Sequence, residues 1–113
     1  MSFMDEEDFA AAIRGAGKAV EVAEWDLAKA DAIERRTVAV VMMKAEAGGA
    51  KTNAAQLRAA DESLETYGAR LDRGVAKGKL AAARAELMAA EIQFKTWQTK
   101  QASVRMEKRV YGA

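Results

Sequence analysis

The sequence contains no cysteine, no histidine and no proline. Without cysteine or histidine, the chain can form no disulfide, no zinc site of the usual kind and no nucleophile activated by imidazole. Two groups of carboxylates, Glu21 with Glu24 and Asp61 with Glu62 and Glu65, each fit one helix face. Metal sites in helical bundles also use histidine, so a solvated acidic face is the better interpretation. We therefore expect no catalytic residues, no bound metal and no cofactor.

Long apolar runs are also lacking. The longest, residues 38–43, is far shorter than the roughly 20 residues that span a bilayer. The start of the chain, residues 1–8, is acidic, whereas a secretory signal begins with positive charge. We expect a cytoplasmic protein that does not bind a membrane.

Alanine accounts for much of the apolar content. Half of the residues are hydrophobic, but 27 of the 113 residues are alanine. Such side chains seal the narrow contact between two helices better than they fill a thick core. Alanine, Glu, Lys, Arg, Leu and Met dominate the sequence, and all of them favour helices. The composition therefore predicts an all-α protein.

The first half of the chain has apolar residues at alternating spacings of four and three, the pattern of one helix face. We predict a helix over about residues 5–47, with Ser2 as its cap and Asp5 as the second member of a capping box. Gly15 and Gly17 interrupt the pattern, so a bend or a frayed first segment is expected there. The pattern comprises Phe9, Ile13, Ala16, Val20, Ala23, Leu27 and Ala30.

The pattern resumes after the polar residues 34–36, at Thr37, Val40, Val41 and Met43. Residues 37–41 are rich in β-branched side chains and are compatible with a strand. No second run of this kind exists to pair with such a strand, so the helix is favoured. Residues 48–52 then form a glycine turn, and Asn53 with Gln56 makes a capping box for the next helix.

A second long helix is predicted over about residues 53–110. It has one apolar seam at Leu57, Ala60, Leu64, Tyr67 and Leu71, spaced as in a coiled coil. A second seam, out of phase with the first, comprises Leu80, Ala83, Leu87, Ala90, Phe94, Trp97, Gln101 and Val104. The change of phase falls at Gly74–Gly78, where the helix is continuous, kinked or broken into a third helix.

The predicted architecture is an elongated helical hairpin with coiled-coil-like packing, a single domain over residues 1–113. Its alanine-rich seams cannot bury Trp25, Leu27, Phe94 and Trp97 well within one chain. We therefore expect a homo-oligomer whose copies cover the exposed stripes. The residues expected in the packing or oligomer seam are Leu57, Leu64, Leu71, Leu80, Leu87, Phe94, Trp97 and Val104.

Charge is distributed unevenly along the chain. Residues 1–69 hold 8 Lys or Arg and 13 Asp or Glu, whereas residues 70–113 hold 10 and 4. Cations interleaved with aromatic side chains are typical of proteins that bind single-stranded nucleic acid. The candidate binding residues are Lys77, Lys79, Arg84, Lys95, Lys100, Arg105, Lys108 and Arg109, with Phe94, Trp97 and Tyr111 as the aromatic residues between or beside them.

A second interpretation explains most of the same cations. Five of them, Lys77, Lys79, Arg84, Lys100 and Arg105, flank the second seam, at positions that commonly pair with acids of a partner helix. The first helix offers such acids at residues 5–8, Glu21, Glu24, Asp26, Asp31 and Glu34. Phe94 and Trp97 would then be buried in the seam. This pairing explains Lys95, Lys108 and Arg109 least well.

The layout resembles the small all-helical accessory proteins of phage recombination and replication modules. It is similar to T4-type recombination mediators in its segment Ala23–Ala30, its glycine turn, and its block from Leu64-Glu65-Thr66-Tyr67-Gly68 through Gln93-Phe94-Lys95-Thr96-Trp97 to Tyr111. The resemblance implies a helical oligomer that binds single-stranded DNA and acts with a recombinase or a single-strand-binding protein. It would place the protein in the host cytoplasm.

Two hypotheses follow. The first is a non-catalytic, phage-type accessory protein of DNA recombination or replication that binds single-stranded DNA as an oligomer. The alternative is a helical protein–protein interaction module, such as a phage anti-defence inhibitor or a small scaffold.

Overall fold

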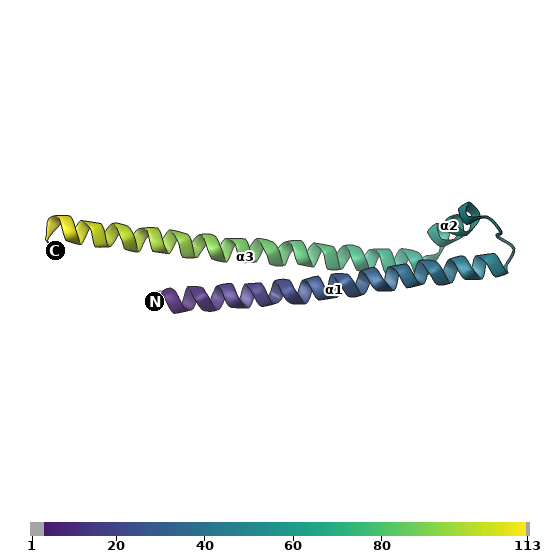
Figure 1. The fold of residues 1–113 in the computed structure, drawn as a ribbon, viewed down its shortest axis with the longest axis horizontal. Coiled ribbons are helices and arrows are strands. Elements are labelled where there is room, and N and C mark those ends of the chain that lie inside the picture. The colour runs from purple at the N-terminus through teal and green to yellow at the C-terminus, as the bar shows by residue number, and fades with distance from the viewer. Residues whose placement is uncertain (1–3, 113) are drawn as a thin grey trace. The chain divides into compact units, whose positions relative to one another are not determined.

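The computed structural model describes residues 4–112, and within them the chain forms three helices and no strand (Figure 1). They are α1 (Glu6–Ala47), α2 (Asn53–Glu62) and α3 (Leu64–Tyr111). The predicted all-α class is confirmed. Contacts group the chain into two units, Met1–Val20 with Ala82–Ala113, and Glu21–Ala81. In each unit a segment of α1 packs against a segment of α3.

The start of α1 is capped one turn later than predicted. The backbone N–H of Asp8 donates to Asp5 Oδ1 at 2.9 Å, and that of Asp5 donates to Asp8 Oδ2 at 3.0 Å. This is a reciprocal capping box made of two carboxylates, which the positive end of the helix dipole also stabilises. The predicted cap, Ser2, lies outside the described residues. The helix continues through Gly15 and Gly17, where a bend was expected.

The β-branched residues 37–41 are part of α1 and do not form a strand. Thr37 Oγ1 donates to the carbonyl oxygen of Ile33 at 2.8 Å, a bond that the preceding helical turn makes available. The helical pattern on both sides of this segment outweighs the strand preference of its side chains.

The turn after α1 needs one glycine. The N–H of Ala50 donates to Ala45 O at 2.9 Å and the N–H of Gly49 to Glu46 O at 3.1 Å, the bonds of a Schellman motif. Gly49 has φ of 113°, a conformation that residues with a Cβ rarely adopt. The helix therefore ends at Ala47, as predicted from the sequence.

The capping of α2 differs by one residue from the prediction. Thr52, rather than Asn53, is the cap, and its Oγ1 accepts a hydrogen bond from the N–H of Ala55 at 3.1 Å. Gln56 does not close a capping box; its Nε2 donates to the carbonyl oxygen of Ala50 at 3.0 Å. That bond fastens the turn to the start of α2.

The second helix predicted over about residues 53–110 is divided in two, and the break lies at Ser63 rather than at Gly74–Gly78. Ser63 has φ of −75° and ψ of 133°, which is extended, and its N–H donates to Ala60 O at 3.1 Å to end α2. Its carbonyl then accepts from the N–H of Tyr67 at 3.0 Å, which begins α3. At Gly74–Gly78, α3 is uninterrupted. Each glycine costs only about 1 kcal/mol relative to alanine, too little to break a packed helix.

One register of α3 faces α1 in both units. In Glu21–Ala81 its buried residues are Thr66, Ala69, Ala76 and Leu80. In the other unit, Ala83, Leu87, Ala90, Phe94 and Trp97 continue this spacing and are half-buried. The second predicted seam thus begins at Thr66, and the expected change of phase does not occur. Six residues of the predicted seams are instead exposed, namely Leu57, Leu64, Tyr67, Leu71, Gln101 and Val104.

The predicted stripe of α1 lies against α3. Phe9 and Ala23 are buried, and the other members of the stripe are half-buried. Leu27 is among these, whereas the Trp25 side chain is 72% exposed. The expectation that one chain cannot cover its large apolar residues therefore applies to Trp25 and not to Leu27.

Candidate nucleic-acid interface

Six of the ten cations of α3 lie along one edge of the helix. Lys77, Arg84 and Arg105 are separated by multiples of seven residues, which is two helical turns. Arg109 follows Arg105 by one turn, and Lys95 lies fourteen residues before Arg109. We call this set the basic edge: Arg70, Lys77, Arg84, Lys95, Arg105 and Arg109. Glu91 is the one acid of α3 at these positions.

The other predicted cations do not join this edge. Lys79 and Lys100 lie on the opposite side of α3, where the same seven-residue count also places Glu65, Asp72, Glu86 and Glu107. Lys108 falls on the continuation of the register that faces α1. The helix thus brings five of the eight predicted binding residues together, and three lie elsewhere.

The edge is accessible to a ligand along most of its length. All of its side chains are exposed. Among residues 4–112, the ion pairs do not include Lys77, Lys95, Arg105 or Arg109. These four cations are therefore available to phosphate groups.

Two other cations of α3 are paired with acids. Arg73 pairs with Asp31, and its Nη1 lies 3.5 Å from Glu34 Oε2. Arg70 pairs with Glu34 through Nε at 3.6 Å and with Asp61 through Nη2 at 2.8 Å. Asp31 and Glu34 are among the acids of the first helix that were predicted to pair with cations of the second. The structure pairs them with Arg70 and Arg73, which are not among the five cations predicted for that role.

Arg73 lies in the register that faces α1, between Ala69 and Ala76, and Glu34 continues the stripe of α1. The seam of Glu21–Ala81 therefore contains a charged layer, which fixes how the two helices align. The hydrogen bond that Arg70 donates to Asp61 raises the pKa of its guanidinium above the ordinary value. Arginine side chains are charged at ordinary pH in any case, so the hydrogen bond to Asp61 joins two charged groups.

The aromatic residues of the unit Met1–Val20 with Ala82–Ala113 contact one another. The ring of Phe9 lies 5.9 Å from that of Phe94 and 5.5 Å from that of Trp97, and Phe94 lies 6.1 Å from Trp97. Phe9 is only 7% exposed. The structure therefore gives these rings a packing role within the chain, rather than that of open platforms for bases. Tyr111 is 81% exposed and, among residues 4–112, contacts no other ring.

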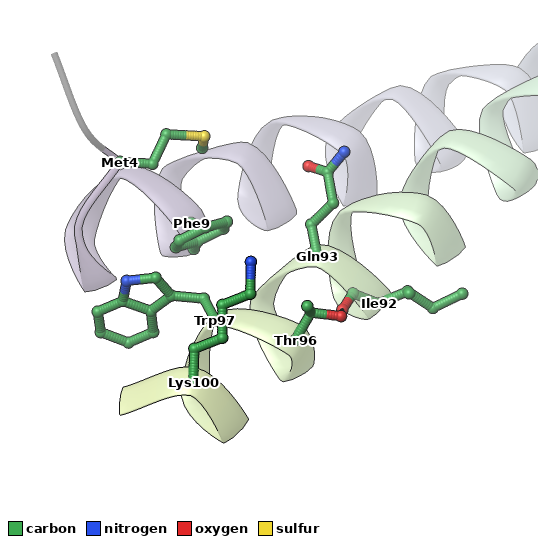
Figure 2. Close-up of a pocket in the computed structure, with 7 residues that line it drawn as sticks. All are labelled: Met4, Phe9, Ile92, Gln93, Thr96, Trp97 and Lys100. Atoms are coloured by element: carbon green, nitrogen blue, oxygen red, sulfur yellow. The ribbon is translucent and has the colours of Figure 1, made fainter. Parts of the chain in front are cut away.

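An open groove lies beside this cluster (Figure 2). Its volume is about 400 Å³, and its walls combine apolar side chains with the ammonium group of Lys100. The lining residues are Met4, Phe9, Ile92, Gln93, Thr96, Trp97 and Lys100. The rings of Phe9 and Trp97 contribute to its walls beside Lys100, so the groove can hold an apolar group next to an anion.

Within residues 4–112, no three carboxylates are grouped closely enough to hold a metal ion. Nor does any helix in this range combine the length and the apolar character that crossing a bilayer requires. The carboxylates of Glu21 and Glu24 and those of Asp61, Glu62 and Glu65 therefore lie at two separate places on the helix surfaces.

The sequence interpretation named the cations but missed their division between two edges. It grouped them by whether they flank the second seam, and so combined Lys77 and Lys79, which lie on opposite sides of α3. Counting every charged residue in steps of seven would have separated them.

Comparisons with protein-family models, with curated proteins and with solved structures found no match to this chain.

Proposed function

We propose that this protein is a non-catalytic accessory of phage-type DNA recombination or replication that binds single-stranded DNA along the basic edge of α3. The observation that carries the proposal is the group Lys95, Arg105 and Arg109. These side chains are exposed, they form no ion pair among residues 4–112, and Glu91 is the one acid on their edge.

The mode of binding follows from the position of the rings. Phe94 and Trp97 pack against Phe9, so stacking of bases on them is not the main source of affinity. Cations along a helix edge contact phosphates, which are the same in every sequence. Binding is therefore expected to be independent of base sequence and to weaken steeply with salt, because each phosphate contact releases condensed counterions.

The place of this activity in recombination or replication is supported by the layout of the chain. A short basic helical protein of this type would act beside a recombinase or a single-strand-binding protein. The acidic α1 and the basic edge of α3 would then serve different partners.

The test is fluorescence anisotropy with a labelled single-stranded oligonucleotide at a series of salt concentrations. The variant Lys95→Gln/Arg105→Gln/Arg109→Gln removes three cations of the basic edge. The matched control, Arg35→Gln/Arg36→Gln/Lys44→Gln, removes the same charge from exposed positions of α1.

The first variant is expected to lose at least about tenfold in affinity. Its slope of log K against log salt should become shallower by about 2, because each phosphate contact on a single strand contributes about 0.7. The control should keep most of the affinity. Equal losses in both variants, or no binding by the native chain at low salt, would contradict the proposal.

A second candidate function is favoured by Trp25. This side chain is 72% exposed, and Val22 and Met43 are exposed at heptad-related positions of α1. Tryptophan is enriched among the residues that dominate protein interfaces. The protein could thus be an interaction module, such as a phage anti-defence inhibitor or a small scaffold.

Trp25→Ala separates the two functions. An interaction module would lose its stoichiometric partner in a pull-down with this variant, while a DNA-binding protein would keep its affinity for the oligonucleotide. Trp25→Phe is the control, since it keeps an aromatic ring at the same position.

A further inference from the structure

A second stripe on α3 remains unexplained by the fold. It faces away from the register that contacts α1 and alternates spacings of four and three from Leu64 to Val110. α3 contains 15 charged residues, and none of them lies on this stripe. We call it the outer stripe: Leu64, Gly68, Leu71, Val75, Gly78, Ala82, Ala85, Ala89, Ile92, Thr96, Thr99, Ser103, Met106 and Val110.

The outer stripe is open in the structure. Leu64 is 85% exposed, and Leu71, Val75, Ile92, Met106 and Val110 are also exposed. Burying its two threonines costs little, because the hydroxyls of Thr96 and Thr99 already donate to Ile92 O and Lys95 O at 3.0 Å. A row of exposed side chains without charge marks a surface that another helix covers.

We propose that a second copy of this chain covers the outer stripe, with the two α3 helices antiparallel. A coiled-coil contact of two helices requires a seven-residue apolar repeat, which is the period of the outer stripe. The occupant is identified by the charges beside the stripe, on the side of α3 opposite the basic edge. They are Glu65, Asp72, Lys79, Glu86, Lys100 and Glu107.

In one antiparallel register, these charges of one copy face opposite charges of the other copy. With Ala82 of one copy facing Ala85 of the other, Lys79 lies opposite Glu86 and Glu65 lies opposite Lys100. Two-fold symmetry makes each pair occur twice, and no like charges face each other. On the other flank, Lys95 lies opposite Gly74, so the basic edges do not repel at this contact.

Neighbouring registers are disfavoured by the same charges. A shift of one heptad toward the N-terminus brings Lys79 opposite Lys79 and Asp72 opposite Glu86. A shift the other way brings Glu86 opposite Glu86. Parallel helices would bring Lys95 near Lys100 and gain no attractive pair. The sequence thus selects one register and one orientation.

Side-chain size agrees with this register. The centre of the contact consists of Ala82, Ala85, Gly78 and Ala89, whose small side chains let two helices approach closely. One further turn out, Val75 of one copy faces Ile92 of the other. The basic edge flanks this contact and contributes no residue to the outer stripe, so the inference does not depend on DNA binding.

The first test is the mass in solution, measured by analytical ultracentrifugation. The native chain is expected at twice the chain mass of 12.2 kDa. Ala85→Glu buries an unpaired charge at the centre and should weaken association at least about tenfold. Ala28→Glu, the same change at an exposed position of α1, should not. About 100 µM is a high protein concentration for this measurement. A native chain that is still monomeric at that concentration overturns the proposal.

The second test is cross-linking, for which the absence of native cysteine is useful. In the proposed register, Val75→Cys/Ile92→Cys places each new thiol opposite one of the other copy and should form an intermolecular disulfide. Val75→Cys alone should not, because its two copies lie about 25 Å apart along the helix axis. Efficient cross-linking of the single variant would indicate parallel helices and refute the proposal.

The third test is a charge exchange. Lys79→Glu should weaken association by about five- to tenfold, because it faces two carboxylates against each other. Adding Glu86→Lys should restore it, since the pair is re-formed with its signs reversed. A double variant as weak as the single one would exclude this register. Circular dichroism on each variant confirms that α1 and α3 remain helical.

Discussion

The contact between α1 and α3 is made by different side chains in the two units of the chain. In Glu21–Ala81 the contact between α1 and α3 is made mainly of small residues, with Leu80, and of the ion pairs around Glu34, Arg70 and Arg73. In the unit of Met1–Val20 with Ala82–Ala113 it is made of Phe9, Phe94 and Trp97. In the first unit, ion pairs and small side chains hold α1 close to α3. In the second unit, aromatic rings hold the two helices together.

This difference decides which cations are available for binding. Where α1 supplies acids to the seam, the arginines of α3 are neutralised within the chain. Where rings form the seam, Lys95, Arg105 and Arg109 pair with no acid among residues 4–112. A basic surface thus depends less on how many cations a helix has than on what faces them.

The largest expected effect is at the aromatic cluster. Phe9→Ala removes the ring that covers Phe94 and Trp97 and leaves a cavity in a contact that contains few other large residues. We expect a loss of about 3 kcal/mol in the local free energy of unfolding. Hydrogen exchange of the amides of residues 6–20, together with Trp97 fluorescence in a Trp25→Phe background, measures it.

Phe9→Leu is the matched control and should lose about 1 kcal/mol, because most of the buried apolar volume is kept. Amides in residues 64–81 should exchange at the native rate in both variants. If Phe9→Ala accelerated exchange equally in the two units, the contrast between them would be wrong.

A smaller effect is expected at the charged layer. Glu34→Ala removes the acceptor that Arg70 and Arg73 share and leaves two guanidinium groups close together. We expect a loss of about 1 kcal/mol, limited because the Arg73 side chain is 48% exposed to water. Urea unfolding followed by circular dichroism measures it.

Glu21→Ala, an exposed acid for which the structure gives no ion pair, is the control and should change stability little. Added salt should reduce the difference in free energy of unfolding between the native chain and Glu34→Ala, because salt screens partly exposed ion pairs. A difference that does not depend on salt would mean that Glu34 acts by packing and not by charge.

The sequence predicted α1 and the turn well, for identifiable reasons. Phe9 to Ala30 repeat with one period, and this period alone determines which face of α1 lies against α3. Gly49 is required by its positive φ, which few other residues adopt. Both features are local, so they can be read without knowledge of the partner helix.

The register of α3 could not be read in this way. Leu57, Leu64 and Leu71 look like a seam, whereas the residues that face α1 there include Thr66 and Arg73. Arg73 becomes a seam residue because α1 offers Asp31 and Glu34 as its partners. Which of two possible stripes packs inside the chain is decided by the partner, and the stripe left over is the outer stripe.

The candidate cations could be named from the sequence, but their arrangement on the helix could not. All eight are exposed, but helical register places five on the basic edge, Lys79 and Lys100 on the opposite side, and Lys108 on the register that faces α1. Phe94 and Trp97 were assigned two opposing roles from the sequence, and the ring of Phe9, far away in the chain, favours packing. Long-range contact of this kind has no local signal.

The smallest effect tests the seam of Glu21–Ala81 directly. The Thr66 side chain is 0% exposed, and its Oγ1 has no hydrogen-bond partner among the described residues. Thr66→Val keeps the shape and removes a buried hydroxyl without a partner among the described residues, so it should raise the free energy of unfolding by about 0.5 kcal/mol. Thr37→Val is the control, since that hydroxyl donates to Ile33 O and its removal should give no gain. Urea unfolding of both variants, measured together, checks the pair. A loss of stability in Thr66→Val would show that the hydroxyl is bonded after all, and that this seam is more polar than its alanines suggest.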